Sequence, residues 1–329
     1  MPDGARRRRH AGDGRNAFGL TPLHRSARET PGDPAGAAHR RGHGYGRACK
    51  YPRHVPDVSD HDHELDGLPV FWRSAPAQAE GVALPLYLHG VPSNSDEWVP
   101  FLERTGGVAP DLPGFGRSGK AGYLQFTIDE YVGFIERFLA WRELERVSIV
   151  VHDWGAVGLA FAQRHPERVG RIVIINAVPL LPGYRWHRTA RMWRTPLLGE
   201  LVMGATGRVT LRQGSKQMNA TPGPMPQAWL DSVLEHFDHG TQRAILRLYR
   251  SSPPEVLASA GARLGELQVP ALVVWGMRDP YIPPRFGQAY AATLADAQLI
   301  QLPDAGHVPW LDRPDVLDTV AGFLGAAAE

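Results

Sequence analysis

The chain has 329 residues, a hydrophobic fraction of 43% and a net charge of +2. This length accommodates one large α/β domain with an inserted subdomain, and the composition is that of a globular protein rather than a disordered or fibrous one. The single cysteine, Cys49, excludes an internal disulfide and a cysteine-based zinc site, and no apolar run approaches the roughly 20 residues that cross a bilayer.

The first 55 residues differ in composition from the rest of the chain. Residues 1–55 contain 12 Lys and Arg against 4 Asp and Glu, whereas residues 56–329 contain 24 against 30. The N-terminal segment lacks hydrophobic periodicity, so we expect a basic, disordered extension. A basic arm that touches an acidic surface is an alternative, although we expect no nucleic-acid partner; a further hypothesis is that translation starts at Val55. No apolar run follows the arginines at 6–9, so we expect no secretion signal and a cytoplasmic protein.

From residue 65 onward, apolar strands and amphipathic helices alternate, which predicts a mostly parallel sheet with helices on both faces. Thr127, with Glu130 three residues later, has the pattern of a capping box at the start of one helix. Strands are absent between 178 and 268, where patches such as 228–237 and 242–249 predict a helical cap that divides the core into 56–177 and 269–329. We expect strands at 68–72, 84–88, 107–109, 147–151, 171–176, 271–275 and 298–302, and helices at 128–139, 157–164, 284–294 and 314–324.

Reactive side chains follow three of the predicted strands, where ligands bind in parallel sheets. Asp153 lies between a buried strand and a helix, which is the place of the nucleophile in a strand–turn–helix elbow that more often carries serine. A carboxylate at this point can displace a leaving group from a saturated carbon and form an ester with itself. Water must then attack that ester, which requires a base and an oxyanion hole. Asp279 and His307 follow later strands, in the order nucleophile, acid, histidine.

Residues 66–329 resemble an α/β-hydrolase of the aspartate-nucleophile branch, which contains epoxide hydrolases and haloalkane dehalogenases. The resemblance rests on five motifs in matching order, at residues 89–92, 111–118, 152–155, 276–280 and 306–307. It implies an α/β-hydrolase fold with an inserted cap, in which Asp153 is the nucleophile, His307 activates water and Asp279 orients His307.

The resemblance also implies an oxyanion hole from the backbone N–H groups of Val91 and Trp154, with Pro92 in the cis form. His89 and His152 begin two of the five motifs and flank the site, and we expect both to be structural. We expect no cofactor or metal. The expected reactants are a small hydrophobic organic substrate and water; no membrane is expected to take part, and the oligomeric state stays open.

The leaving group separates the two activities. An epoxide leaves as an alkoxide and needs a proton donor, for which Tyr249 and, more weakly, Tyr184 are the cap candidates. A halide needs N–H donors; Trp154 can supply one, but Val91 occupies the position where one dehalogenase type has asparagine. Asn94 stands at the wrong place in the motif, so the second donor of a dehalogenase would come from a cap tryptophan. The sequence therefore favours an epoxide hydrolase, with a haloalkane dehalogenase as the alternative and a non-enzymatic module as a remote one. The cap tryptophans are Trp186, Trp193 and Trp229.

Overall fold

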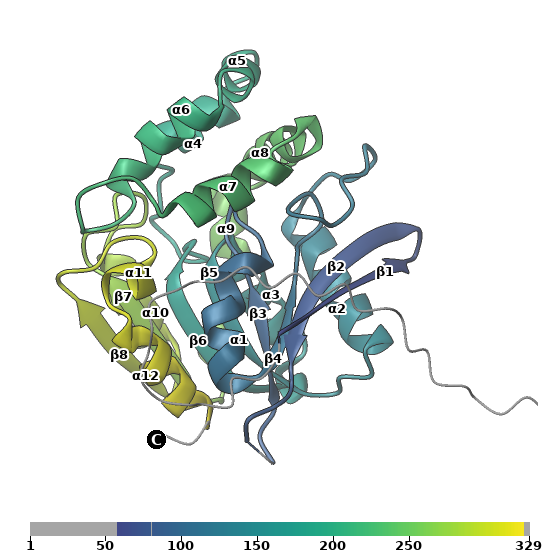
Figure 1. Ribbon diagram of the computed structural model, residues 1–329. Coiled ribbons are helices and arrows are strands. Elements are labelled where there is room, and N and C mark those ends of the chain that lie inside the picture. Colours follow the sequence, from purple (N-terminus) through teal and green to yellow (C-terminus); the bar gives the residue numbers. More distant parts are fainter. Residues whose placement is uncertain (1–57, 80, 326–329) are drawn as a thin grey trace, which may run out of the picture. The chain divides into compact units, whose positions relative to one another are not determined.

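The computed structural model describes residues 58–79 and 81–325, so the predictions for residues 1–55 lie outside the described residues. Its centre is an eight-stranded sheet in the order β1-β2-β4-β3-β5-β6-β7-β8 (Figure 1). The pairings of β1 with β2 and of β2 with β4 are antiparallel, and the other pairings are parallel, which confirms the predicted fold class. The strands are β1 (Ser59–Leu65), β2 (Leu68–Ala75), β3 (Leu84–Leu88), β4 (Gly107–Pro110), β5 (Val147–Asp153), β6 (Val169–Ala177), β7 (Ala271–Gly276) and β8 (Ala297–Leu302).

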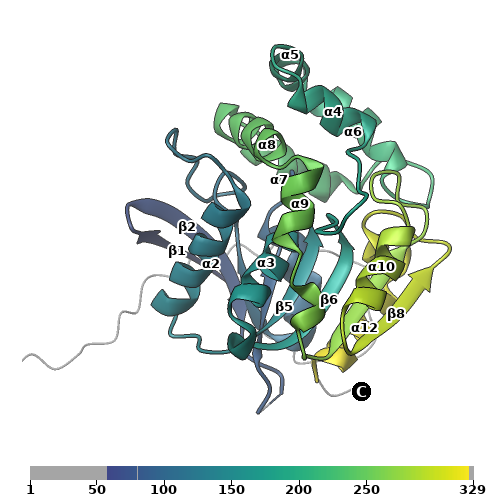
Figure 2. The same cartoon turned by 180° about the vertical axis from the view of Figure 1, so that it is seen from behind.

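Helices cover both faces of the sheet (Figures 1 and 2). The α-helices are α1 (Val99–Thr105), α2 (Ile128–Trp141), α3 (Val157–Arg164), α4 (Arg188–Arg194), α5 (Leu198–Gly204), α6 (Arg208–Gly214), α7 (Gln227–His236), α8 (His239–Ser251), α9 (Pro254–Ala260), α10 (Arg285–Thr293), α11 (Pro309–Asp312) and α12 (Asp315–Leu324). Short 3-10 helices are η1 (Ser95–Trp98), η2 (Trp154–Ala156), η3 (Pro166–Arg168), η4 (Ser215–Gln217) and η5 (Leu264–Glu266).

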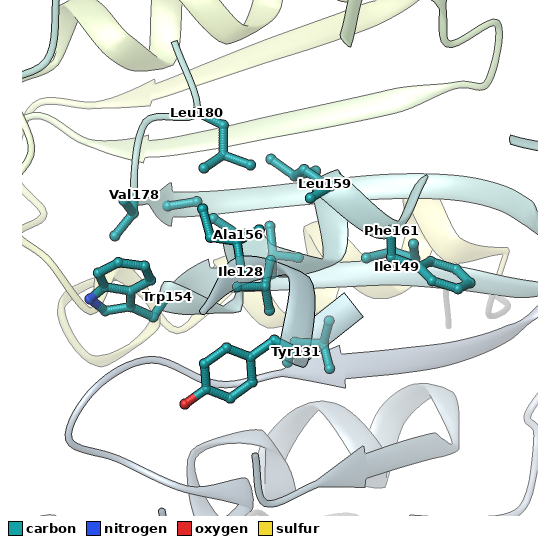
Figure 3. Close-up of a cluster of buried hydrophobic side chains, with 14 of the residues drawn as sticks. Ile128, Tyr131, Ile149, Trp154, Ala156, Leu159, Phe161, Val178 and Leu180 are labelled. Carbon is teal, nitrogen blue, oxygen red and sulfur yellow. The ribbon is translucent and has the colours of Figure 1, made fainter. Parts of the chain in front are cut away.

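The central strands are apolar throughout because both of their faces are covered. In β5, Ile149 and Val151 belong to a core cluster with α2, α3 and α10, whereas Val150 between them belongs to a second cluster with α1 and α12. This alternation follows from the two-residue period of a strand. Figure 3 shows Ile149 in the first cluster with Leu159 and Phe161 of α3. The strand that leads to Asp153 is therefore held rigidly between two cores.

The helix α2 begins as the sequence predicts. Thr127 accepts a hydrogen bond from the Glu130 N–H, and the Glu130 side chain accepts one from the Thr127 N–H. This confirms the predicted capping box, which provides partners for two N–H groups that the helix itself cannot bond.

The segment between β6 and β7 is helical in the structure and contains α4 to α9. It packs on loops of the sheet domain: the Thr241 hydroxyl donates to the Gly114 carbonyl at 3.0 Å, and the Asn94 amide donates to the Ser232 hydroxyl at 3.0 Å. Both views place α4, α5, α7 and α8 beyond one end of the strands. The division into core and cap at residues 178 and 268 remains our interpretation. Within the described residues, no helix is both long enough and apolar enough to span a bilayer.

The sequence analysis missed β1. Its residues are polar and mostly exposed, and they pair with β2 at the edge of the sheet. The strand is held by side chains as well as by the backbone: His61 stacks on Trp72 with ring centroids 4.9 Å apart, and His63 stacks on Trp141 at 4.2 Å. No apolar alternation marks such a strand, so periodicity could not reveal it.

Replacing Thr127 by Ala should lower the free energy of unfolding by about 1 kcal/mol, since the Glu130 N–H loses its partner at the start of a buried helix. Urea denaturation measures the change. Thr127→Ser retains the hydroxyl and is the matched control; equal stability of the two variants would contradict the role assigned to the cap.

Candidate active site

Three strands of the sheet deliver the predicted acids and histidine to one edge. Asp153 is the last residue of β5, Asp279 lies three residues beyond β7, and His307 lies five residues beyond β8. Because β5, β6, β7 and β8 are parallel neighbours, their carboxyl ends meet at the same edge. The structure therefore brings together side chains that are up to 154 positions apart, 153 to 307, in the sequence.

Asp153 occupies a sharp turn between β5 and η2. Its φ is 47° and its ψ is −116°, an uncommon conformation for a residue with a side chain. The turn fits only because two neighbours are glycines: a Cβ on Gly155 would lie 2.0 Å from the Leu88 carbonyl oxygen, and one on Gly90 would lie 2.6 Å from the Asp153 Cβ. Because Gly90 has no side chain, the Asp153 side chain packs directly against the loop that follows β3.

His307 lies between the two carboxylates. Its Nδ1 is 2.8 Å from Asp279 Oδ2, and its Nε2 is 3.7 Å from Asp153 Oδ2. Asp279 is itself fixed, because the N–H groups of Tyr281 and Ile282 donate to its Oδ1 at 2.7 and 3.0 Å. The geometry places an Nδ1–H on His307 toward Asp279 and leaves Nε2 facing Asp153.

Asn176, at the end of β6, was missed by the sequence analysis. Its amide donates to Asp279 Oδ2 at 2.8 Å and to the Gly276 carbonyl at 3.2 Å, and its oxygen accepts from the Gly276 N–H at 2.8 Å. It therefore fixes the end of β7 and the carboxylate that bonds His307. A buried polar residue at the end of an otherwise apolar strand was the available signal.

Two backbone N–H groups contact the Asp153 carboxylate. The Val91 N–H donates to Asp153 Oδ1 at 2.9 Å, and the peptide bond between Val91 and Pro92 is cis. The backbone N–H of Trp154 interacts with the same carboxylate and, like that of Val91, lowers the pKa of this group. These are the two donors predicted for an oxyanion hole, and in the structure they converge on one carboxyl group.

Burial and the charges of the neighbouring groups shift the pKa values of Asp153, Asp279 and His307 in different directions. Burial raises the pKa of Asp153 and outweighs the nearby histidines and backbone donors. Burial also opposes ionisation of Asp279, but His307 lowers the pKa of Asp279 below its ordinary value. Burial would lower the pKa of His307, yet Asp279 and Asp153 together raise it to about 9. With its pKa raised to about 9, His307 is a cation at neutral pH.

Aromatic side chains from the helical segment form a wall beside Asp153. Trp186 stacks on Trp154 with centroids 5.4 Å apart, and Tyr249 meets the Trp154 ring edge-on at 5.2 Å. Tyr184 lies 5.1 Å from Trp186. The charge of Asp153 contributes to the raised pKa values of Tyr184 and Tyr249, after burial, which is the largest cause for both. Both predicted tyrosines are therefore near the carboxylate and keep their protons at neutral pH.

The polar atoms of this wall differ in whether they have partners. The Trp186 N–H donates to the Ser252 carbonyl at 2.9 Å, so it is engaged. The Trp154 indole N–H is near the Tyr249 hydroxyl, but it makes no hydrogen bond of ordinary geometry with any described residue. The Tyr184 hydroxyl and the Trp193 N–H are likewise buried without a partner in this part of the chain. These are donors that a bound group could use.

Asn94 and Trp229 lie elsewhere. The Asn94 amide donates to Ser232 of α7, and its oxygen accepts from the Asp96 N–H. Trp229 packs against the core cluster on the α1 and α12 side of the sheet. The structure does not bring either residue into the group around Trp154.

The two flanking histidines make internal hydrogen bonds. His89 accepts at Nε2 from the Leu112 N–H at 2.8 Å, so its Nδ1 carries the proton and donates to the Gly90 carbonyl at 2.8 Å. His152 lies between the Glu97 carboxylate and the carbonyl oxygen of His307. Neither imidazole replaces His307 between the carboxylates.

Comparison with known proteins gives the family. The profile of the Alpha/beta hydrolase family matches residues 86–319. The chain belongs to the alpha/beta hydrolase family, and it is a hydrolase. This confirms the family predicted from the five motifs.

Relatives of this hydrolase include haloalkane dehalogenases. The chain is 26% identical over 287 residues to a haloalkane dehalogenase of Bradyrhizobium diazoefficiens, covering 75% of this chain and 88% of the relative. It is 32% identical over 216 residues to haloalkane dehalogenase 1 of Mycobacterium bovis, covering 59% and 67%. The crystal structure of haloalkane dehalogenase DbeA from Bradyrhizobium elkani matches 82% of this chain and 98% of its own with a TM-score of 0.70 at 22% identity, which shows the common fold.

Replacing Asp153 by Asn should lower the pKa of His307 from about 9 toward its ordinary value of 6.5, because one of the two carboxylates that stabilise the imidazolium is gone. The raised pKa of His307 also affects the stability of the fold. Protonation of His307 stabilises the folded state fully below about pH 6.5, and this contribution is lost as the pH rises through about 9. NMR titration of His307 measures the shift. Asp304→Asn, at an exposed ion pair with Arg313, is the control; identical pKa values in both variants would contradict the proposed coupling.

Proposed function

We propose that this hydrolase cleaves a carbon–halogen bond at a saturated carbon through an ester on Asp153. The relatives named haloalkane dehalogenases support this choice over the epoxide hydrolysis that the sequence analysis preferred. The observation that carries it is the buried indole N–H of Trp154, the residue directly after Asp153, which makes no hydrogen bond of ordinary geometry with the described residues. A halide leaving group requires such an N–H donor.

In the first step, an Asp153 oxygen attacks the carbon and the carbon–halogen bond breaks. The halide leaves with the bonding electron pair and is stabilised by the Trp154 N–H. The side chain of Val91 offers no donor, so the second donor comes from the helical segment. The Tyr184 hydroxyl is our candidate, because it is buried without a partner and its raised pKa keeps it protonated.

In the second step, water attacks the carbonyl carbon of the ester. The ester has removed the negative charge of Asp153, so the pKa of His307 falls and its Nε2 becomes free to accept a proton from water. The oxyanion that forms on Asp153 is stabilised by the N–H groups of Val91 and Trp154. Collapse regenerates the carboxylate and releases an alcohol. The proton that His307 lost to solvent when the ester formed is replaced by the proton taken from water, so His307 returns to its cationic resting state. The sum is alkyl halide plus water to alcohol, halide and one proton.

Epoxide hydrolysis is the second candidate, and the two tyrosines favour it. Tyr184 and Tyr249 both border Trp186, with centroids 5.1 and 4.8 Å from it, and both lie within the field of Asp153. Two neutral hydroxyl groups near the nucleophile suit the protonation of an alkoxide leaving group. The non-enzymatic module gains no support from this arrangement.

A parallel screen of the full-length protein separates the two candidates. One arm follows halide release from short bromo- and chloroalkanes, and the other follows diol formation from styrene-oxide-type epoxides, with Asp153→Ala in both arms. Halide release that depends on Asp153 supports the proposal. Diol formation without halide release would overturn it in favour of the second candidate, and no Asp153-dependent product in either arm would contradict both.

Replacing His307 by Gln should block the second step and trap the ester, because no base remains to activate water; turnover should fall by roughly a thousandfold or more. Intact-mass spectrometry identifies the adduct: an alkyl halide adds the alkyl group in place of one hydrogen, whereas an epoxide adds its whole mass. The double variant with Asp153→Ala should remain unmodified. Full turnover without an adduct in the single variant would contradict the two-step scheme.

Replacing Trp154 by Phe should slow halide release by about a hundredfold, since the ring is retained while the N–H donor is lost. Replacing Tyr249 by Phe should leave halide release nearly unchanged. Single-turnover rates with a bromoalkane compare the two variants. The opposite ranking would transfer the leaving-group role from Trp154 to Tyr249.

A further inference from the structure

A buried acid lies beneath the candidate active site and has no part in the steps above. Glu97, in η1, is 8% exposed. Its Oε1 accepts from the Gly90 N–H at 3.1 Å, and its Oε2 accepts from the Ser93 hydroxyl at 2.5 Å. Oε1 is also 3.3 Å from His152 Nδ1. One carboxylate thus contacts both the loop that carries Val91 and the residue that precedes Asp153.

The hydrogen-bond partners of the two ring nitrogens of His152 indicate which of them carry protons. Its Nε2 is 3.0 Å from the carbonyl oxygen of His307, which can only accept, so Nε2 carries a proton. Its Nδ1 faces Glu97 Oε1, which already accepts from the Gly90 N–H. A neutral His152 would turn a nitrogen lone pair toward a carboxylate oxygen. A second proton on Nδ1 removes this repulsion and gives Glu97 a third donor, and such multiple donation favours the ionised carboxylate.

We propose that Glu97 is a positioning residue that holds His152 as an imidazolium and, through it, links the loop at residues 90–93 to His307. The link runs from the Gly90 N–H through Glu97 and His152 to the backbone carbonyl of His307. It connects the two loops that must act together on an ester at Asp153, and it places a positive charge behind the nucleophile. This catalytic consequence rests on the proposed function.

The surroundings of His152 screen its proposed positive charge only weakly, so this charge acts on neighbouring titratable groups. Besides Glu97, the titratable groups that face it are His307, its own neighbour Asp153 and, through Glu97, His89. The His307 ring centroid is 5.0 Å away, and the indoles of Trp98 and Trp310 lie at 6.5 and 4.9 Å. Charges on a buried side chain among aromatic rings are weakly screened. Consistent with this, His152 lowers the pKa of Asp153, and Glu97 raises that of His307.

The first test is the protonation of His152, read by ¹⁵N NMR of the imidazole nitrogens in the full-length protein. The wild type should show protons on both Nδ1 and Nε2 of His152 at neutral pH, and Glu97→Gln should show a single proton there. A wild-type His152 with an unprotonated Nδ1 at neutral pH would overturn the proposal. This result needs neither a substrate nor a stable variant.

The second test is the pH dependence of ester formation, measured by intact mass in a His307→Gln background with a bromoalkane and an epoxide. Glu97→Gln preserves the side-chain shape but removes the charge that keeps His152 positive. Asp153 should then ionise at higher pH. The acid limb, which is the low-pH side of the profile of ester-formation rate against pH, should therefore move up by about one pH unit or more. A merely structural role would lower the rate at all pH values without moving this limb.

Glu103→Gln, on the neighbouring helix α1 and half-buried, is the matched control and should leave the limb in place. An acid limb that Glu97→Gln does not move would overturn the assigned role. If no ester forms in the background variant with either substrate, the proposed function fails, whereas the NMR spectrum still decides the state of His152.

Discussion

The constraint on which the site depends is the burial of two carboxylates around one imidazole. Removing ionised groups from water is costly unless each finds a countercharge or donors. His307 provides the shared countercharge, and the backbone N–H groups of Val91, Tyr281 and Ile282 supply donors to the remaining oxygens. The parallel strands, the strained turn and the glycines that permit it together bring these groups to one point.

The chemistry of such a site is divided between two parts of the chain. In the proposed mechanism, the sheet and the loops that follow its strands supply the nucleophile, the base and the oxyanion donors, and these serve any leaving group on a saturated carbon equally well. Beside the Trp154 N–H, the segment between β6 and β7 adds the hydroxyl groups of Tyr184 and Tyr249, which we propose as further donors to a halide or an alkoxide. Whether a halide or an alkoxide departs therefore depends on very few N–H and O–H groups, while the core of the reaction is common to both.

Local patterns in the sequence predicted the features that local physics determines. The apolar strands, the Thr127 cap and the order of Asp153, Asp279 and His307 follow from short-range periodicity and from motifs at strand ends. Asn176 and Glu97 escaped prediction because their importance comes from partners that folding brings close: Asn176 bonds Asp279, 103 positions away, and Glu97 meets His152, 55 positions away. Single polar residues of this kind carry no recognisable spacing of their own.

The polar edge strand β1 also affects how copies of this protein meet. A strand at the edge of a sheet exposes unpaired backbone groups that can pair with another chain. β1 carries Asp60, Asp62 and Glu64 along that edge, with His61 and His63 between them turned onto Trp72 and Trp141. A second sheet that approached β1 would have to desolvate these carboxylates or set them against its own. The same residues that hid this strand from sequence analysis thus protect the sheet from edge-to-edge aggregation.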